Sequence, residues 1–152
     1  MKNKNLRRDI IAKQRRITIR DLRKTLRQAR KGLPEGSSHL SPEDKALWIA
    51  ALRSGQFRQG KFCLQPAKDT YCCLGVLNCL VPEEKQADPG NSYLSFLPKE
   101  IQRPLAGAND LMHGADATNG WLLYINKDPI GEATPQIAPT FHQLARVIEE
   151  EL

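Results

Sequence analysis

The clearest pattern of apolar and polar positions lies near the N-terminus. Apolar residues recur at intervals of three and four from Ile19 to Leu33, which places them on one narrow stripe of an α-helix. Thr18 begins a pattern that resembles a shortened capping box, and Gly32 is typical of a helix end. The pattern predicts a helix over about residues 18–33.

The next segment predicts a helix and a hairpin. Ser41, followed by Pro42 and two acids, is typical of a helix start, and the helix pattern continues to about Gly55. Residues 61–64 and 70–74 are short apolar runs on either side of a turn-like sequence. Two such runs predict an antiparallel β-hairpin.

The remainder of the chain predicts mostly helix and loop. Apolar residues at helical spacing indicate a helix over residues 74–80, and Pro98 predicts the start of another short helix. Residues 106–120 are rich in Gly, Asn and Asp and are typical of turns, and residues 121–125 form a buried segment of uncertain type. Thr140 begins a final helix with a capping box and an apolar face.

Together these elements predict an α+β fold. We expect a mostly helical small domain with a short antiparallel β-hairpin, which spans residues 37–152, and a basic N-terminal helical arm over residues 1–36. The first sixteen residues contain few apolar side chains. We therefore expect that stretch of the arm to be mobile until it binds a partner.

The charge distribution changes the picture of the arm. Residues 1–36 hold thirteen of the Lys and Arg residues and three acids, whereas residues 37–152 hold ten bases and fourteen acids. A strongly basic segment on a mildly acidic body indicates a polyanionic partner, most often nucleic acid. The sequence does not distinguish DNA from RNA.

The bases of the predicted helix lie along one flank beside the apolar stripe. Six of them recur at intervals of seven residues, which is close to two turns, so they fall within an arc of roughly 100°. Such a ridge can follow a phosphate backbone while the apolar stripe rests on the body. The predicted nucleic-acid-binding residues are Arg15, Arg16, Arg20, Arg23, Lys24, Arg27, Arg30 and Lys31.

A solvated helix face, a coiled coil and a membrane-surface helix each fit the ridge less well. An ordinary solvated face usually mixes both signs of charge. A coiled coil usually needs more than the two heptads present. A membrane-surface helix usually carries Trp or Phe, and residues 1–36 contain neither.

One stretch resembles a known group of proteins. Residues 48–55 (WIAALRSG), Gln59-Gly60 and residues 71–77 (YCCLGVL) resemble a family of small, largely uncharacterised proteins of bacteriophages and prophages. The resemblance covers roughly residues 45–80 and 121–152. It implies a phage accessory protein that acts against host defence, and it supplies no catalytic residues.

The cysteines do not indicate a metal site. Cys63, Cys72, Cys73 and Cys79 lack the paired spacing of two to four residues that zinc sites use. Adjacent cysteines on a strand point to opposite faces, so Cys72 and Cys73 would rarely ligate one ion together. Because buried Cys behaves as a small hydrophobic residue, we expect core packing. The sequence shows no phosphate loop, Rossmann glycine pattern or paired-His zinc motif. We therefore expect a non-enzymatic protein with no cofactor and no metal.

A rival hypothesis places the function in the body. Aromatic and basic residues there could line a pocket that sequesters a nucleotide-like signal: Arg53, Arg58, Lys61, Tyr71, Trp121 and Tyr124. The simpler interpretation is that Trp48 and Trp121 anchor the core. A third hypothesis is an inhibitor that docks on a host protein–nucleic acid complex.

The expected partners follow from these hypotheses. Nucleic acid comes first, DNA or RNA, bound mainly through the backbone; a host protein and self-association remain open. No apolar run approaches the roughly 18 residues needed to cross a bilayer, so we expect no membrane partner. We expect a soluble protein in the cytoplasm of the bacterial host.

Overall fold

The computed structural model describes residues 2–34, 40–110 and 138–152. Five α-helices lie in these ranges, in chain order α1 (Lys2–Gly32), α2 (Pro42–Arg53), α3 (Cys73–Leu80), α4 (Lys99–Asn109) and α5 (Phe141–Glu151). A 3-10 helix, η1 (Glu83–Lys85), follows α3, and two short strands, β1 (Arg58–Gln59) and β2 (Thr70–Tyr71), precede it. The predicted mostly helical domain is confirmed.

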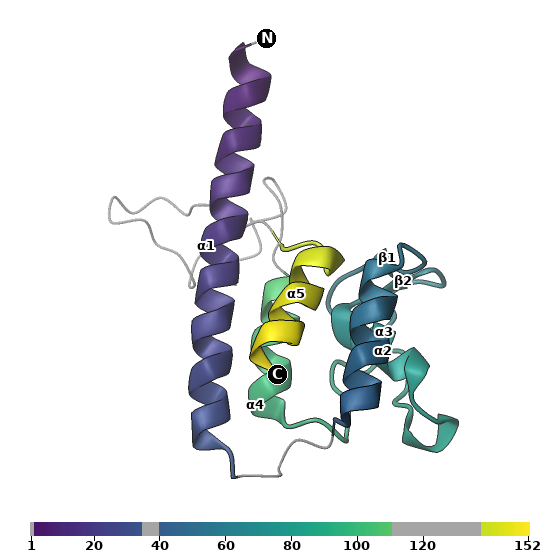
Figure 1. The fold of residues 1–152 in the computed structure, drawn as a ribbon. Helices are drawn as coiled ribbons and strands as arrows, with labels where there is room; N and C mark the ends of the chain where they lie inside the picture. The colour runs from purple at the N-terminus through teal and green to yellow at the C-terminus, as the bar shows by residue number, and fades with distance from the viewer. Residues whose placement is uncertain (1, 35–39, 111–137) are drawn as a thin grey trace.

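The helices are arranged in layers (Figure 1). α4 and α5 lie in the middle, with α1 along one side and with α2 and α3 on the other. α1 packs against both α4 and α5, while α2 packs against α5 and α3. The N-terminal end of α1 projects well beyond the other helices.

α1 is longer than the sequence pattern predicts. It begins at Lys2, so residues 2–17 continue the helix where we expected a mobile arm. Thr18 is not a helix start but a buried residue in the middle of α1, with 5% of its surface exposed. The stretch before it contains no Gly or Pro and is rich in Lys and Arg, which are good helix formers. The predicted end at Gly32 is confirmed.

The apolar stripe of α1 rests on the body, as predicted. Leu22 and Leu26 are 4% and 0% exposed and belong to the main hydrophobic core. Ile19, Ala29 and Leu33 are partly buried against the same core. The second half of α1 is therefore part of the packed structure and does not stand apart from it.

The predicted antiparallel hairpin is wrong. β1 and β2 pair in parallel, with Arg58 opposite Thr70 and Gln59 opposite Tyr71. Residues 61–64, expected as the first strand, contain no strand because their backbone groups bond elsewhere: Leu64 N donates to Asn91 O at 2.8 Å. Phe62 also has a φ of 81°, which an extended strand does not allow.

The helix starts around the core follow their predicted caps. Ser41 Oγ accepts from Asp44 N at 3.0 Å at the start of α2. Thr140 and Gln143 form a complete capping box at the start of α5. α4 begins just after Pro98 as predicted, but it extends to Asn109, so residues 106–109 are helical where turns were expected. Residues 111–120 lie outside the described residues. The expected buried segment at residues 121–125 lies outside the described residues.

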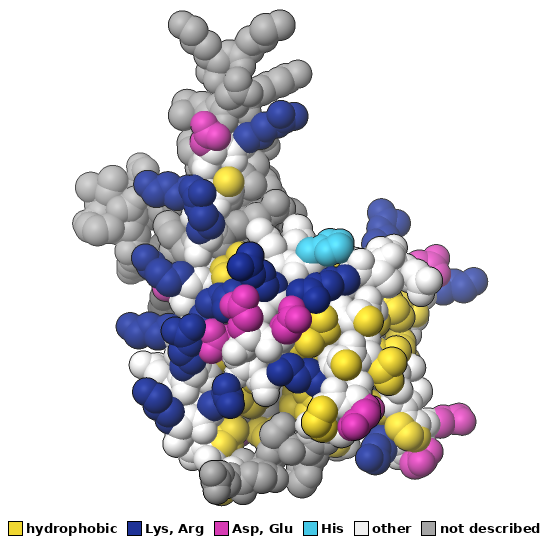
Figure 2. Space-filling model, viewed as in Figure 1, with side chains coloured by type: hydrophobic (Ala, Val, Ile, Leu, Met, Phe, Trp, Pro, Cys, Tyr) yellow, Lys and Arg dark blue, Asp and Glu magenta, His cyan; other side chains and the backbone are white. Residues whose placement is uncertain are grey.

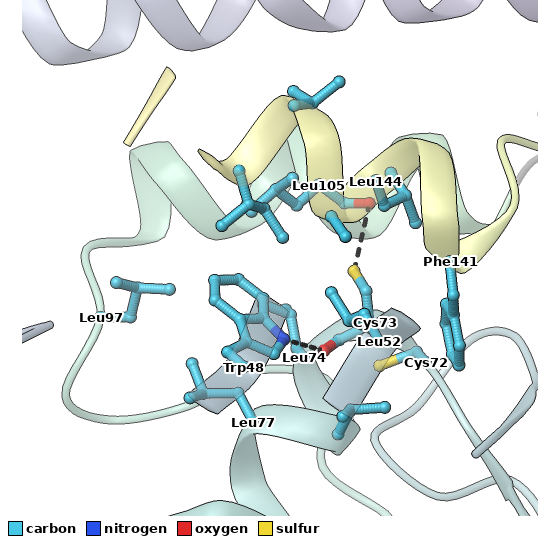
Figure 3. Close-up of a cluster of buried hydrophobic side chains, with 14 of the residues drawn as sticks. Trp48, Leu52, Cys72, Cys73, Leu74, Leu77, Leu97, Leu105, Phe141 and Leu144 are labelled. Atoms are coloured by element: carbon cyan, nitrogen blue, oxygen red, sulfur yellow. Dashed lines mark hydrogen bonds between the residues drawn. The ribbon is translucent and has the colours of Figure 1, made fainter. Parts of the chain in front are cut away.

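Among the side chains that the structure describes, Trp48 is the largest that is fully buried (Figure 3). Its indole Nε1 donates to Cys73 O at 2.8 Å, which ties α2 to the first turn of α3. Leu105 of α4 and Leu144 of α5 line the same cluster and are fully buried. The interpretation of Trp48 as a core anchor is confirmed, whereas Trp121 lies outside the described residues.

Candidate nucleic-acid interface

The eight predicted ridge residues separate into two groups on α1. Arg23, Arg27 and Arg30 face α5 and bond to its last two residues. Arg16, Arg20, Lys24 and Lys31 are exposed, and the side chain of Arg15 is outside the described part of the structure. Four predicted ridge residues are therefore exposed and make no bond to α5. Arg27 and Arg30 are exposed as well, but they and the partly buried Arg23 already bond to α5.

The contact between α1 and α5 centres on Glu151. Arg27 binds it with both sides of its fork: Nε donates to one carboxylate oxygen at 2.9 Å and a terminal nitrogen to the other at 2.7 Å. Arg23 contacts Glu151 at 3.3 Å and also bonds to Glu150. Arg30 donates to the backbone oxygen of Glu151 at 2.6 Å. A bidentate arginine–carboxylate pair fixes direction as well as distance, so this contact orients α1 on the body.

The three arginines also compensate an unfavourable arrangement within α5. The helix ends in three consecutive glutamates, and negative charge is disfavoured at a helix C-terminus because the backbone carbonyls there are already partly negative. Arginine from α1 supplies the positive charge at that end. The hydrogen bond from Arg27, and then its charge, lower the pKa of Glu151, while hydrogen bonds from Arg146 and Arg23 lower the pKa of Glu150.

Sequence reasoning missed this contact because α5 lies more than a hundred residues beyond α1. One signal was present: residues 149–151 are acidic at the end of a clearly amphipathic helix, where cations are the stabilising residues. Such a run favours a basic partner, and the basic flank of α1 is the richest source of one in the chain.

The lowered pKa of Glu151 gives a pH-dependent prediction. A carboxylate whose folded-state pKa lies below its unfolded value stabilises the fold at neutral pH, and it loses that contribution as pH falls below about 4.3 and through the folded-state pKa. We expect Glu151→Gln to lower the urea midpoint at pH 7 and to have a much smaller effect near pH 3. Urea unfolding at several pH values measures both effects.

The matched control is Glu84→Gln, because Glu84 is exposed on η1. We expect it to leave the midpoint nearly unchanged at pH 7. An equal loss of stability in Glu151→Gln at pH 7 and pH 3 would contradict a role for the Glu151 charge.

A second contact continues from α5 to α2. Arg53 pairs with the Glu149 carboxylate at 2.5 Å, and Lys45 Nζ donates to the Glu149 backbone oxygen at 3.2 Å. Arg53 is one of the residues predicted to line a ligand pocket in the body. Its partner in the structure is instead the acidic end of α5.

The remaining predicted pocket residues are brought together only in part. Tyr71 lies on β2, and its ring meets Phe57 edge to face with the centroids 5.3 Å apart. Arg58 is exposed on the neighbouring strand β1, and Lys61 follows it in the chain. Two further members, Trp121 and Tyr124, lie outside the described residues. The pocket therefore stays a prediction.

A buried amide network connects the strands to the helices. Asn109, which is 0% exposed, accepts from Gln59 Nε2 at 3.1 Å and donates to Gly60 O at 2.9 Å. Gln59 Nε2 also donates to the backbone oxygen of Pro139 at 2.9 Å, next to the start of α5. Sequence reasoning noted Gln59-Gly60 but not Asn109. These contacts give the pair a structural role, because they hold β1 against α4 and the start of α5.

The cysteines occupy two kinds of environment. Cys72 and Cys73 are 3% and 0% exposed, so core packing is confirmed for these two, whereas Cys79 is exposed and Cys63 is partly buried. Neither of the buried pair lies on a strand: Cys72 caps α3, where its sulfur accepts from Gly75 N at 3.3 Å, and Cys73 begins the helix.

Burial suppresses the reactivity of both buried thiols. It raises the pKa of Cys72 to about 11 and the pKa of Cys73 well above its ordinary value. The thiolate is the reactive form of cysteine, so these thiols are poor nucleophiles at neutral pH. Within residues 2–34, 40–110 and 138–152, no three His, Cys, Asp or Glu residues gather in a way that could hold a metal ion.

No helix in the described ranges has the length and apolar character needed to span a membrane.

Comparisons with known proteins give a family but no described activity. No curated protein and no solved structure matches the chain. One family model matches residues 40–152, which is most of the chain and leaves α1 outside the match. The chain therefore belongs to the family described as Domain of unknown function (DUF8296).

Proposed function

We propose that this protein is a non-enzymatic nucleic-acid-binding protein and that the exposed bases of α1 bind the phosphates of the target. The observation that carries the proposal is the line of exposed bases on the outer side of α1. Figure 2 shows Lys and Arg side chains along the part of α1 that is not grey, with acidic side chains gathered beside α5. Arg20 contacts Asp21 of its own helix at 3.5 Å, but both side chains are well exposed, and such pairs are weak.

The helix geometry aligns three of these bases. Arg20, Lys24 and Lys31 are four and seven residues apart, so they lie within about 40° of one another around the helix axis. The opposite side of the same turns carries Leu22 and Leu26, which are buried in the core. The ridge is thus held on a packed helix and needs little ordering when it binds, which favours affinity.

The setting of the function is also part of the proposal. The resemblance of residues 48–55 and 71–77 to phage and prophage proteins supports an accessory protein that acts against host defence. The matched family has no described activity, and it does not include α1. The basic helix therefore gives this chain a feature beyond the shared domain.

The test replaces the three aligned bases together. We expect Arg20→Gln, Lys24→Gln and Lys31→Gln to reduce the slope of log affinity against log salt by about 3 on duplex DNA, because each lost phosphate contact removes about 0.9. Glutamine is a good helix former and the three side chains are exposed, so the fold should be kept. Fluorescence anisotropy across a salt series measures the slope, and circular dichroism checks the helix content.

The control changes the same charge elsewhere. Lys68, Lys85 and Lys99 are exposed residues of the body, and replacing all three by Gln removes the same net charge. We expect this variant to bind with nearly the wild-type slope. If it loses as much affinity as the α1 variant, binding depends on net charge alone and the ridge is not the binding site.

A further inference from the structure

The projecting end of α1 differs from the ridge in how its surface is exposed. Thr18 is the first residue along α1 whose side chain is described as buried. The described side chains before it, among them Arg8, Lys13 and Arg16, are all exposed. Residues 2–17 form about 24 Å of helix, and Figure 1 shows this end extending beyond α4 and α5.

The projecting end also carries bases on more than one side. Arg8 and Leu26 are eighteen residues apart, which is five whole turns, so Arg8 lies on the side of α1 that becomes buried further along. Lys13 and Lys31 are also eighteen residues apart, so Lys13 continues the outward ridge. Arg8 and Lys13 are about 140° apart around the axis. Residues 2–17 contain seven bases and one acid.

Bases on two sides of a projecting helix end indicate a target with phosphates on two sides. A helix with its side chains is about 10–12 Å across, and the major groove of B-form DNA is about 12 Å wide with a phosphate backbone along each wall. The major groove of A-form RNA is deep and too narrow to admit side chains. Single strands are bound largely by stacking on aromatic side chains, and residues 1–36 contain none.

We propose that the partner of α1 is duplex DNA and that residues 2–17 lie in its major groove, while the ridge formed by Arg20, Lys24 and Lys31 follows one phosphate backbone beside it. This inference rests on the proposed nucleic-acid binding and names the partner of that site. The contacts are electrostatic and made to phosphates, so they select the form of the duplex and not its base sequence.

The test compares two variants of the full-length chain on two duplexes. The first variant replaces Arg8, Lys13 and Arg16 by Gln, and the second replaces Arg20, Lys24 and Lys31 by Gln. Each is titrated against a short DNA duplex and an RNA duplex of the same sequence at matched salt. We expect the wild-type chain to bind DNA at least about tenfold more tightly than RNA. We expect the first variant to lose this preference, and its slope of log affinity against log salt on DNA should be smaller by about 3.

The second variant should weaken binding to both duplexes by similar factors, because the ridge can follow either backbone. A competition assay adds an independent measurement. Methyl green, which occupies the major groove, should displace the wild-type chain from DNA more readily than netropsin, which occupies the minor groove.

The outcomes separate the two proposals. Equal wild-type affinity for the DNA and RNA duplexes, or equal loss on both in the first variant, would overturn the groove assignment while leaving phosphate binding by the ridge intact. Displacement by netropsin but not by methyl green would also overturn it. Absence of binding to either duplex at low salt would overturn the proposed function itself.

Discussion

Replacing Gly75 by Ala is expected to destabilise the protein by about 3–5 kcal/mol, or to abolish cooperative unfolding altogether. A Cβ on Gly75 would lie 1.8 Å from Leu64 O and 2.7 Å from the Leu64 carbonyl carbon. Both are backbone atoms, so no side-chain rotation can relieve the clash. Either the first turn of α3 or the backbone at Leu64 must move.

The backbone at Leu64 is poorly placed to move. Leu64 O accepts from Cys72 N at 3.1 Å, and Leu64 N donates to Asn91 O at 2.8 Å. The Leu64 side chain is itself 0% exposed, so a shift would also disturb the core. The glycine is required because another chain segment crosses α3 at this residue.

The measurement is urea unfolding followed by circular dichroism, with Gly107→Ala as the matched control. Gly107 lies within α4, and a Cβ there would meet nothing within 4 Å. Alanine in a helix interior is favoured over glycine by about 0.5–1 kcal/mol, so this variant should be slightly more stable than wild type. A Gly75→Ala variant within about 1 kcal/mol of wild type would show that the close approach to Leu64 is not a real constraint.

The parts of the fold that depend on neighbouring residues could be predicted from the sequence. The caps at Ser41 and Thr140 and the end of α1 at Gly32 all depend on residues within one turn. The start of α1 could not be located in the same way. Thr18 has the chemistry of a cap, but its side chain is used in packing within a helix that had already begun at Lys2.

The parts that depend on distant residues were missed. The run around Phe62 and Leu64 has the composition of a strand, yet its backbone bonds go to Asn91 and Cys72 rather than to a neighbouring strand. The same limit applies to the candidate interface. The basic flank could be predicted from the repeat of seven residues. The hydrogen bonds that Arg23, Arg27 and Arg30 make to α5 could not, because they depend on the distant residues Glu150 and Glu151.

The consequence for function is a narrower and stiffer candidate surface than the sequence alone predicts. The bases that are exposed and make no bond to α5 are those of the projecting end and of the outer side of α1. Arg27 and Arg30 are also exposed, but together with Arg23 they bond to α5 and set the direction of the helix. Deletion of residues 1–36 would remove Leu22 and Leu26 from the core together with the basic surface. A deletion therefore cannot separate binding from folding, whereas substitution of exposed bases can.

The second large effect is expected from Leu26→Ala, which should lower the unfolding free energy by about 2–5 kcal/mol. Leu26 is 0% exposed in the main core, where α1 packs against α4 and α5. Truncation to Ala removes buried apolar surface and leaves a cavity that a helix fixed by Arg27 and Glu151 can close only in part. Alanine has the highest helix propensity, so the loss would come from packing and not from the helix itself.

The matched control is Leu47→Ala on α2, because Leu47 is 53% exposed. The same substitution there should change stability by less than about 0.5 kcal/mol. Urea unfolding of both variants decides whether α1 is part of the folded core or an appendage. If Leu26→Ala is as mild as Leu47→Ala, α1 does not contribute to the core in solution. If it is severe, the basic surface and the folded domain form one cooperative unit, coupled through the packing of α1 on α4 and α5.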